Sequence, residues 1–145
     1  MKKIVLDTNC LLMSLPKISP YRGLWDSFLK GEFVLCISNE IVEEYQEILS
    51  KKVGSQIANN IVQLIINRTN VEFVNPTYRF GLIQTDADDN KFVDCAIVAG
   101  AICIVSNDAH FKELAKIPFP KVTVFNIIEF ITILHNWKNN LLSND

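Results

Sequence analysis

Residues 92–105 read FVDCAIVAGAICIV, an apolar stretch in which Asp94 is the one charged residue. The pattern predicts a buried helix over residues 88–100, which begins with carboxylates suited to a helix N-terminus, and a short strand over residues 102–105. A helix that is apolar nearly all round, followed by a β-branched strand, is typical of the inside of a layered protein. This stretch therefore predicts an α/β fold.

The rest of the chain repeats the alternation of short strands and helices. Runs rich in β-branched residues predict four more strands, at residues 3–6, 33–37, 71–74 and 122–125. Helical patterns lie between them, at residues 24–29, 39–49, 55–67, 109–115 and 127–142. This alternation specifies βαβ crossovers, so we expect a parallel sheet in one domain that spans residues 1–145. Ligands of such sheets bind beyond the carboxyl ends of the strands.

Composition limits the possible functions. The chain has 145 residues, of which 49% are apolar and 21% charged, the balance of a soluble globular protein. Its net charge of −2 supplies no basic field for a nucleic acid, although bound cations can bring phosphates to an acidic site. We expect no signal peptide and no membrane span. The four cysteines lie in apolar contexts without a CxxC spacing, so we expect reduced core thiols in a cytoplasmic protein.

Two aspartates stand at expected strand ends. Asp7 directly follows the first strand, and Asp108 follows the fourth. A carboxylate between apolar segments is poorly solvated unless a cation or hydrogen-bond donors meet it. Each aspartate is therefore either a helix N-cap or part of a site. Asp86, Asp88 and Asp89 form another acidic group, which either favours the next helix through its dipole or helps to bind a metal.

Two further carboxylates lie on expected helices. Glu44 borders the apolar face of the helix at 39–49, whereas the other glutamates of that helix lie further round. It is either a site residue or the partner of a neighbouring lysine. Asp94 lies inside its apolar helix, where an ionised carboxylate needs a cation or several donors. It is therefore either functional or held by backbone donors.

Taken together, the four carboxylates favour a metal site. They come from two strand ends and two helix faces on the same side of a parallel sheet. Like charges gathered in one place repel, and they become protonated unless a divalent cation neutralises them. Oxygen ligands favour Mg²⁺ or Mn²⁺ over zinc, and we expect both histidines to be surface or packing residues.

Four segments of the chain resemble the motif regions of PIN domains. They are VLDTN (5–9), SNEIVEEYQEIL (38–49), DADDNKFVDCA (86–96) and IVSND (104–108). They occur in the expected order over nearly the whole chain. The resemblance is greatest to the bacterial and archaeal branch of toxins from toxin–antitoxin pairs. One departure is Asn107, where a glycine is common.

The resemblance implies a three-layer α/β/α sandwich with a five-stranded parallel sheet, and a ribonuclease activity that uses Mg²⁺ or Mn²⁺. The catalytic and metal-binding acids that it implies are Asp7, Glu44, Asp94 and Asp108. Asn9 and Ser106 would orient these carboxylates, and Asp89 is implied as an auxiliary acid.

Other functions and the partners follow from the same pattern. A phosphoryl-transfer enzyme also places an aspartate after its first strand, but the further acids or strand-end lysine that it needs are not found. A PIN domain that binds RNA or serves as a scaffold without catalysis is the alternative.

A toxin would bind an RNA substrate and an antitoxin that covers the acidic cleft. The helices at 24–29 and 127–142 are apolar enough for a homodimer. Candidates to hold the RNA are Arg22, Arg79, Lys91 and Lys112.

Overall fold

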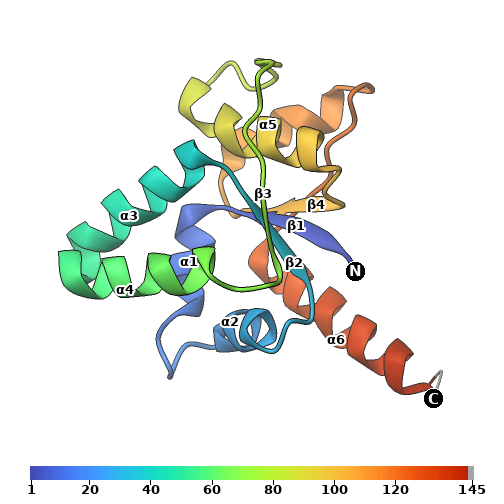
Figure 1. The fold of residues 1–145 in the computed structure, drawn as a ribbon. Coiled ribbons are helices and arrows are strands. Elements are labelled where there is room, and N and C mark those ends of the chain that lie inside the picture. Colours follow the sequence, from blue (N-terminus) through green and yellow to red (C-terminus); the bar gives the residue numbers. More distant parts are fainter. Residues whose placement is uncertain (144–145) are drawn as a thin grey trace.

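Five parallel strands form one sheet in the computed structural model, which describes the backbone of residues 1–143 and the side chains of residues 1–140 (Figure 1). The strands are β1 (Lys3–Leu6), β2 (Val34–Ile37), β3 (Val71–Phe73), β4 (Cys103–Val105) and β5 (Val124–Phe125). Their order across the sheet is β3-β2-β1-β4-β5, and every neighbouring pair is parallel. The prediction of an α/β fold with a five-stranded parallel sheet is confirmed.

Helices connect the strands and lie on both sides of the sheet. They are α1 (Thr8–Ser14), α2 (Arg22–Leu29), α3 (Asn39–Val53), α4 (Ser55–Ile66), α5 (Asn90–Ala99) and α6 (Ile127–Ser143), with the 3₁₀ segments η1 (Ala87–Asp89) and η2 (Ala109–Lys116). α5 packs against β1, β2 and β4 on one side, whereas α2 and α6 pack against each other on the other side (Figure 1). α3 and α4 form a hairpin joined at Gly54, whose positive φ of 87° favours glycine.

The core uses the apolar helix faces that we considered for a homodimer. Trp25, Phe28 and Phe130 are at most 6% exposed, and the Phe33 and Phe130 rings meet edge to face with centroids 5.7 Å apart. Among the described residues, these apolar side chains of α2 and α6 are thus buried within the chain, whereas Ile128 of α6 is 63% exposed. The four cysteines are buried free thiols, as expected. None of the described helices is long and apolar enough to cross a membrane.

The order of the strands creates a crevice at the carboxyl end of the sheet. The chain runs from β1 outward to β2 and β3, and then returns to β4 on the other side of β1. Where the direction of winding reverses, the connections leave the sheet on opposite sides, so a gap opens between the two strand ends. Leu6 pairs with Val105 in the register of β1 and β4. The residues that directly follow, Asp7 and Ser106, therefore stand side by side in this crevice.

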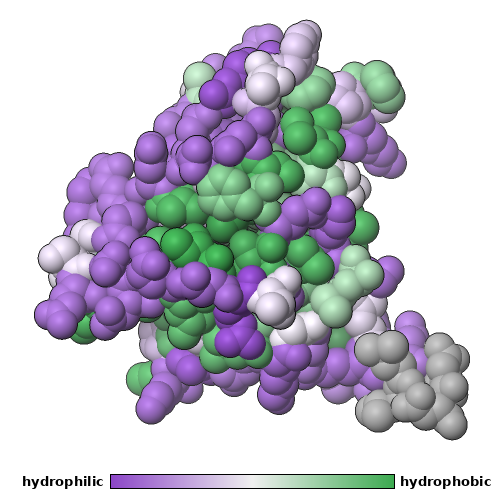
Figure 2. Space-filling view, in the orientation of Figure 1, coloured by the Kyte–Doolittle hydropathy of each residue, from purple (hydrophilic) through white to green (hydrophobic). Residues whose placement is uncertain are grey.

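β3 is an edge strand with an apolar surface. Phe73, at its end, is 47% exposed, and Val71 is partly buried. Figure 2 shows apolar side chains gathered over this part of the molecule, surrounded by hydrophilic ones. This surface is separate from the crevice, because β2 lies between β3 and β1.

Candidate metal centre

Asp7 and Ser106 form the floor of the crevice. Asp7 is 6% exposed, and its carboxylate accepts hydrogen bonds from the backbone N–H of Asn9 at 2.8 Å and from Ser106 Oγ at 2.6 Å. Ser106 Oγ in turn accepts from the backbone N–H of Asp108 at 3.0 Å. The two strand ends are therefore joined by side-chain hydrogen bonds. Asn9 contributes through its backbone rather than its amide side chain.

Asp7 and Asp108 also cap the segments that follow them. The Asp7 carboxylate accepts from the N–H two residues on, at the start of α1, and Asp108 Oδ1 accepts from the N–H of His110 at 2.9 Å, at the start of η2. The two interpretations of these aspartates, cap and site residue, are thus compatible. Capping fixes the position of each carboxylate at the end of its strand.

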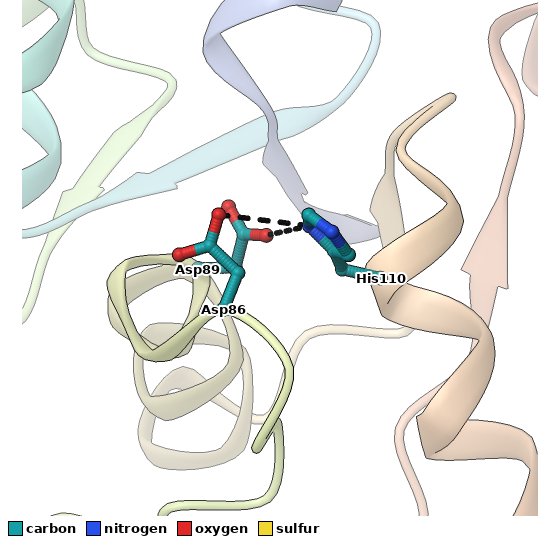
Figure 3. A group of neighbouring side chains, drawn as sticks. All are labelled: Asp86, Asp89 and His110. Atoms are coloured by element: carbon teal, nitrogen blue, oxygen red, sulfur yellow. Dashed lines mark hydrogen bonds and ion pairs between the residues drawn. The ribbon is translucent and has the colours of Figure 1, made fainter.

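Asp86 and Asp89, from the segment before α5, face His110 of η2 (Figure 3). One ligand atom from each of Asp86, Asp89 and His110 lies within 4.8 Å of the other two. His110 Nδ1 is 3.2 Å from Asp89 Oδ2, 3.6 Å from Asp86 Oδ2 and 3.1 Å from Asp108 Oδ1. The imidazole therefore lies among three carboxylates.

The position of His110 among these carboxylates is not predicted by the sequence. The His110 side chain is 43% exposed, which agrees with the expected surface position. Its ring nitrogen Nδ1 nevertheless faces the three carboxylates, which together with Asp7 and Glu44 are called the acidic cluster. The one signal available was its place two residues after Asp108, at the first turn of the capped segment.

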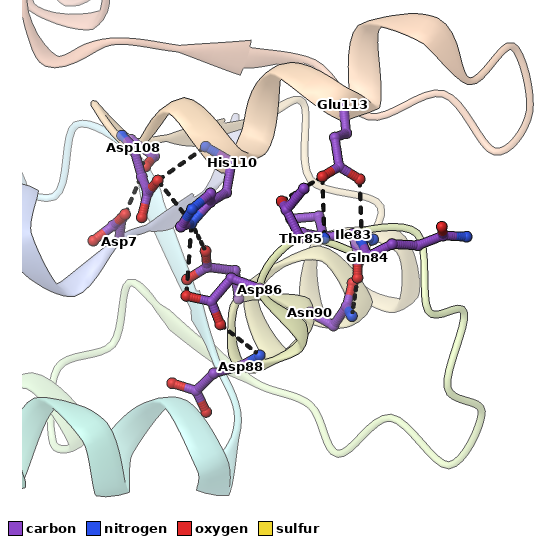
Figure 4. Close-up of polar contacts among 12 residues, drawn as sticks. Asp7, Ile83, Gln84, Thr85, Asp86, Asp88, Asn90, Asp108, His110 and Glu113 are labelled. Carbon is purple, nitrogen blue, oxygen red and sulfur yellow. Dashed lines mark hydrogen bonds and ion pairs between the residues drawn. The ribbon is translucent and has the colours of Figure 1, made fainter.

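Two side chains hold the acidic loop in place (Figure 4). Glu113, on η2, accepts from the backbone N–H of Gln84 at 3.0 Å and of Thr85 at 3.2 Å, and also from the Thr85 hydroxyl. Asn90 both donates to and accepts from the backbone of Ile83, at 2.9 and 2.8 Å. The loop that ends in Asp86 is therefore tied to η2 on one side and to α5 on the other.

The carboxylates resist ionisation together. Burial raises the pKa of Asp7 against the hydrogen bonds from Ser106 and Asn9, and the charges of Asp108 and Glu44 raise it further. Burial also raises the pKa of Asp89 to about 6, opposed by its hydrogen bond to His110 and supported by neighbouring carboxylates. Such mutual repulsion is what a divalent cation would relieve.

Glu44 lies on the α3 side of Asp7. Its carboxylate accepts from the hydroxyl of Thr8 and pairs with Lys91 Nζ at 2.9 Å. Lys91 also pairs with Asp88 Oδ1 at 3.1 Å. Glu44 therefore has the lysine partner that was one of its two expected roles. Its charge also acts on Asp7, so it belongs to the acidic cluster as well.

Asp94 is buried, but the structure does not bring it together with Asp7 and Asp108. It is 1% exposed, and its carboxylate accepts from the backbone N–H of Phe80 at 3.2 Å, with Arg79 Nη1 at 3.8 Å. The charges that act on its pKa are those of Arg79 and Glu40, whereas burial is the main cause that raises this pKa. Asp89 lies near Asp7 and Asp108 in its place.

The basic side chains that we considered for holding the RNA differ in their contacts. Arg22 pairs with Asp26 at 3.0 Å on α2, and Arg79 pairs with Glu40 at 2.5 Å. Lys112 borders a cavity of about 870 Å³ next to the crevice, which extends from Ser106 and Asp108 along η2 and β5 to Lys121. This cavity is apolar over much of its wall, with a lysine on each side.

The donor set fits a divalent cation. Asp7, Asp89 and Asp108 offer carboxylate oxygens at one end of the sheet, and the pKa values of Asp7 and Asp89 are raised first by burial and further by the neighbouring carboxylates. Oxygen donors suit Mg²⁺ and Mn²⁺, and one imidazole nitrogen is tolerated better by Mn²⁺ than by Mg²⁺.

The comparisons with known proteins agree with this architecture. A family model described as PIN domain matches residues 3–110, so the chain belongs to the PIN domain family. No match was found among curated protein sequences.

Solved structures share the fold at low sequence identity. VapBC2 from Rickettsia felis, bound to a DNA fragment from its promoter, has a TM-score of 0.59 at 17% identity, over 86% of this chain and 98% of that one. DNA-bound VapBC from Salmonella typhimurium has a TM-score of 0.59 at 17% identity, over 88% of this chain and 99% of that one. The PIN domain endonuclease Utp24 has a TM-score of 0.52 at 20% identity, over 86% and 84%. The family and fold predicted from the motifs are therefore confirmed.

Proposed function

We propose that the chain is a divalent-metal-dependent nuclease that cleaves RNA, with Asp7, Asp89 and Asp108 as the ligands of a Mg²⁺ or Mn²⁺ ion. The observation that carries the proposal is the acidic cluster at the carboxyl ends of β1 and β4: the charges of Asp7 and Asp108 act on Asp89, and one ligand atom from each of Asp86, Asp89 and His110 lies within 4.8 Å of the other two. We assign to Asp89 the role that the sequence indicates for Asp94, because the charges of Asp108 and Asp7 act on Asp89, whereas those that act on Asp94 come from Arg79 and Glu40.

Each residue has a role that its contacts support. Ser106 and the backbone of Asn9 hold the Asp7 carboxylate by hydrogen bonds of 2.6 and 2.8 Å, and this orientation keeps both oxygens in fixed directions. His110 holds Asp89 close to Asp108 through Nδ1. A bound ion would lower the pKa of a water molecule and stabilise the charge on the leaving oxygen of a phosphodiester.

The cavity beside Asp108 supports a nucleic-acid substrate. It begins at the crevice, and Lys112 and Lys121 place two positive charges on its walls. Phosphates bind such lysines, whereas the apolar wall suits a base. The choice of RNA over DNA rests on the resemblance to PIN-domain toxins.

A protein partner belongs to the same proposal. We interpret the VapBC proteins as pairs of a toxin and an antitoxin. This chain shares the fold of those proteins. We therefore propose an antitoxin whose basic side chain enters the acidic crevice. Copurification of the chain with the product of a neighbouring gene would support this part.

The first test is cleavage of structured and single-stranded RNAs and of single-stranded DNA by the purified protein with Mg²⁺, Mn²⁺ or EDTA. We expect RNA cleavage that EDTA abolishes and that Asp89→Asn reduces by at least about 100-fold, because a lost metal ligand exceeds the effect of a lost supporting residue. Asp94→Asn is the matched control, and it retains most of the activity. Metal binding without cleavage of any substrate would favour the alternative, an RNA-binding or scaffold protein.

A further inference from the structure

Lys91 is a nearly buried cation inside the acidic cluster. It stands in the first turn of α5, and its side chain is 12% exposed. Its ammonium group lies 2.9 Å from Glu44 Oε1 and 3.1 Å from Asp88 Oδ1. A lysine at a protein surface normally keeps its ammonium group in water, so this degree of burial indicates that the charge is needed where it lies.

Glu44 is fully occupied by donors of the chain itself. Oε1 pairs with Lys91, and Oε2 accepts from the hydroxyl of Thr8, a residue that is 3% exposed. The Glu44 side chain is 18% exposed. Asp7 also accepts a hydrogen bond at each oxygen, but its donors are neutral, whereas Glu44 has a positive charge at Oε1 that would repel a metal ion.

Lys91 keeps its charge in this place. Its two carboxylate partners, at 2.9 and 3.1 Å, supply the acceptors and the negative charge that a largely buried ammonium group needs. The cluster therefore has two ends. At one end Asp89 and Asp108 face the His110 imidazole and Asp7 lies near them, and at the other end Glu44 pairs with the ammonium group of Lys91.

We propose that the Lys91 ammonium group keeps a second metal ion away from Glu44, so that the centre binds a single divalent ion and Glu44 pairs with the lysine instead of ligating. This inference rests on the proposed function, since it assumes that the Asp7 end binds metal. Two-metal centres place their ions about 3.5–4 Å apart between shared carboxylates, and an ammonium group at Glu44 excludes a second cation by repulsion. Lys91 is a positioning residue, and it leaves the first ion to the aspartates.

The test is the stoichiometry of Mn²⁺ binding to the full chain, measured by calorimetry and by electron paramagnetic resonance. We expect one Mn²⁺ per wild-type chain and two per Lys91→Met chain, with spin coupling between the ions in the variant. Lys91→Arg keeps the charge and binds one ion. Lys112→Met removes a lysine outside the cluster and serves as the matched control, also with one ion.

The double variant Lys91→Met with Glu44→Gln tests whether Glu44 is the ligand of the second ion in the single variant. It removes both charges of the pair, so it leaves no unpaired carboxylate, and we expect it to bind one ion again. Two ions in the wild-type chain, or one ion in a folded Lys91→Met chain, would overturn the role of Lys91 and leave the nuclease proposal standing. No Mn²⁺ binding by the wild-type chain would overturn both.

Discussion

Asp89 makes the stability of the metal-free protein depend on pH. Its pKa in the folded chain is about 6, mainly through burial, against about 3.9 in an unfolded chain. The folded chain therefore binds more protons than the unfolded chain between these values, and stability falls as pH rises through that range. The raised pKa of His110 acts in the same direction, because its contribution is lost as pH rises through the folded value.

We expect the melting temperature in EDTA to fall as pH rises from about 4 to about 7. Asp89→Asn should melt at or above the wild-type temperature at pH 7.5, and the difference should shrink toward pH 4. Mn²⁺ should raise the wild-type melting temperature at pH 7.5 and not that of the variant. Parallel melting curves for the two proteins over this range would contradict the assigned titration.

At the scale of single residues, the sequence predicts which side chains are buried better than it predicts where those side chains point. Asp94 was expected to be buried because it is the one charge in an apolar stretch, and it is. Its carboxylate nevertheless points to Arg79 and Phe80, since the direction of a side chain depends on where the helix begins. Asp89 stands in the 3₁₀ turn η1, whose wider rotation per residue no apolar pattern in the sequence reveals.

At the scale of elements, three aspartates of the cluster begin the segments that carry them. Asp7, Asp86 and Asp108 each accept a hydrogen bond from the N–H two residues on. The same side chain thus ends a strand or loop, begins a helix and contributes charge to the crevice. The strands themselves were predicted to within two residues at each end, because runs of β-branched residues locate them.

The path of residues 74–86 was not predictable in the same way, since long-range hydrogen bonds determine it. Glu113, from η2, holds Gln84 and Thr85, and its pKa is lowered chiefly by the hydrogen bond from the Thr85 hydroxyl. Nothing in the local sequence of the loop announces a partner some 28 residues further on. Only the fold brings the two segments together.

Removal of Glu113 should therefore loosen the acidic loop. In Glu113→Ala we expect Mn²⁺ affinity to fall by about 10-fold, the size typical of a lost supporting residue. Amide exchange at Gln84 and Thr85 should become faster, whereas the strands should exchange as before. Glu47→Ala, which removes an exposed α3 glutamate paired with Lys51, is the control and should change neither quantity.

At the scale of the whole molecule, strand order decides where the chemistry lies. β1 and β4 lie side by side although almost a hundred residues separate them, and their ends deliver Asp7 and Asp108 to one crevice. The sequence indicated this arrangement through the rule for parallel sheets and the order of its motifs. Contacts between α3, α5 and η2 determine which of these carboxylates pair with a lysine or a histidine. The sequence alone does not predict those contacts.

The buried thiols offer a measure of how the metal centre is linked to the stability of the whole fold. Burial raises the pKa of Cys10, Cys36 and Cys103 to about 12 and that of Cys95 above its ordinary value. The thiolate is the reactive form, so at pH 8 the folded chain should scarcely react with iodoacetamide. Labelling then requires unfolding, and all four cysteines, which are buried in the folded chain, should react together.

A ligand that binds only the folded chain reduces the unfolded population. We therefore expect Mn²⁺ to slow the labelling of all four cysteines in the wild-type chain and to leave labelling of Asp89→Asn unchanged, as followed by mass spectrometry. Rapid modification of a single cysteine in the folded protein would instead reveal local opening at that residue. Equal slowing in both proteins would mean that Mn²⁺ stabilises the fold somewhere other than at Asp89.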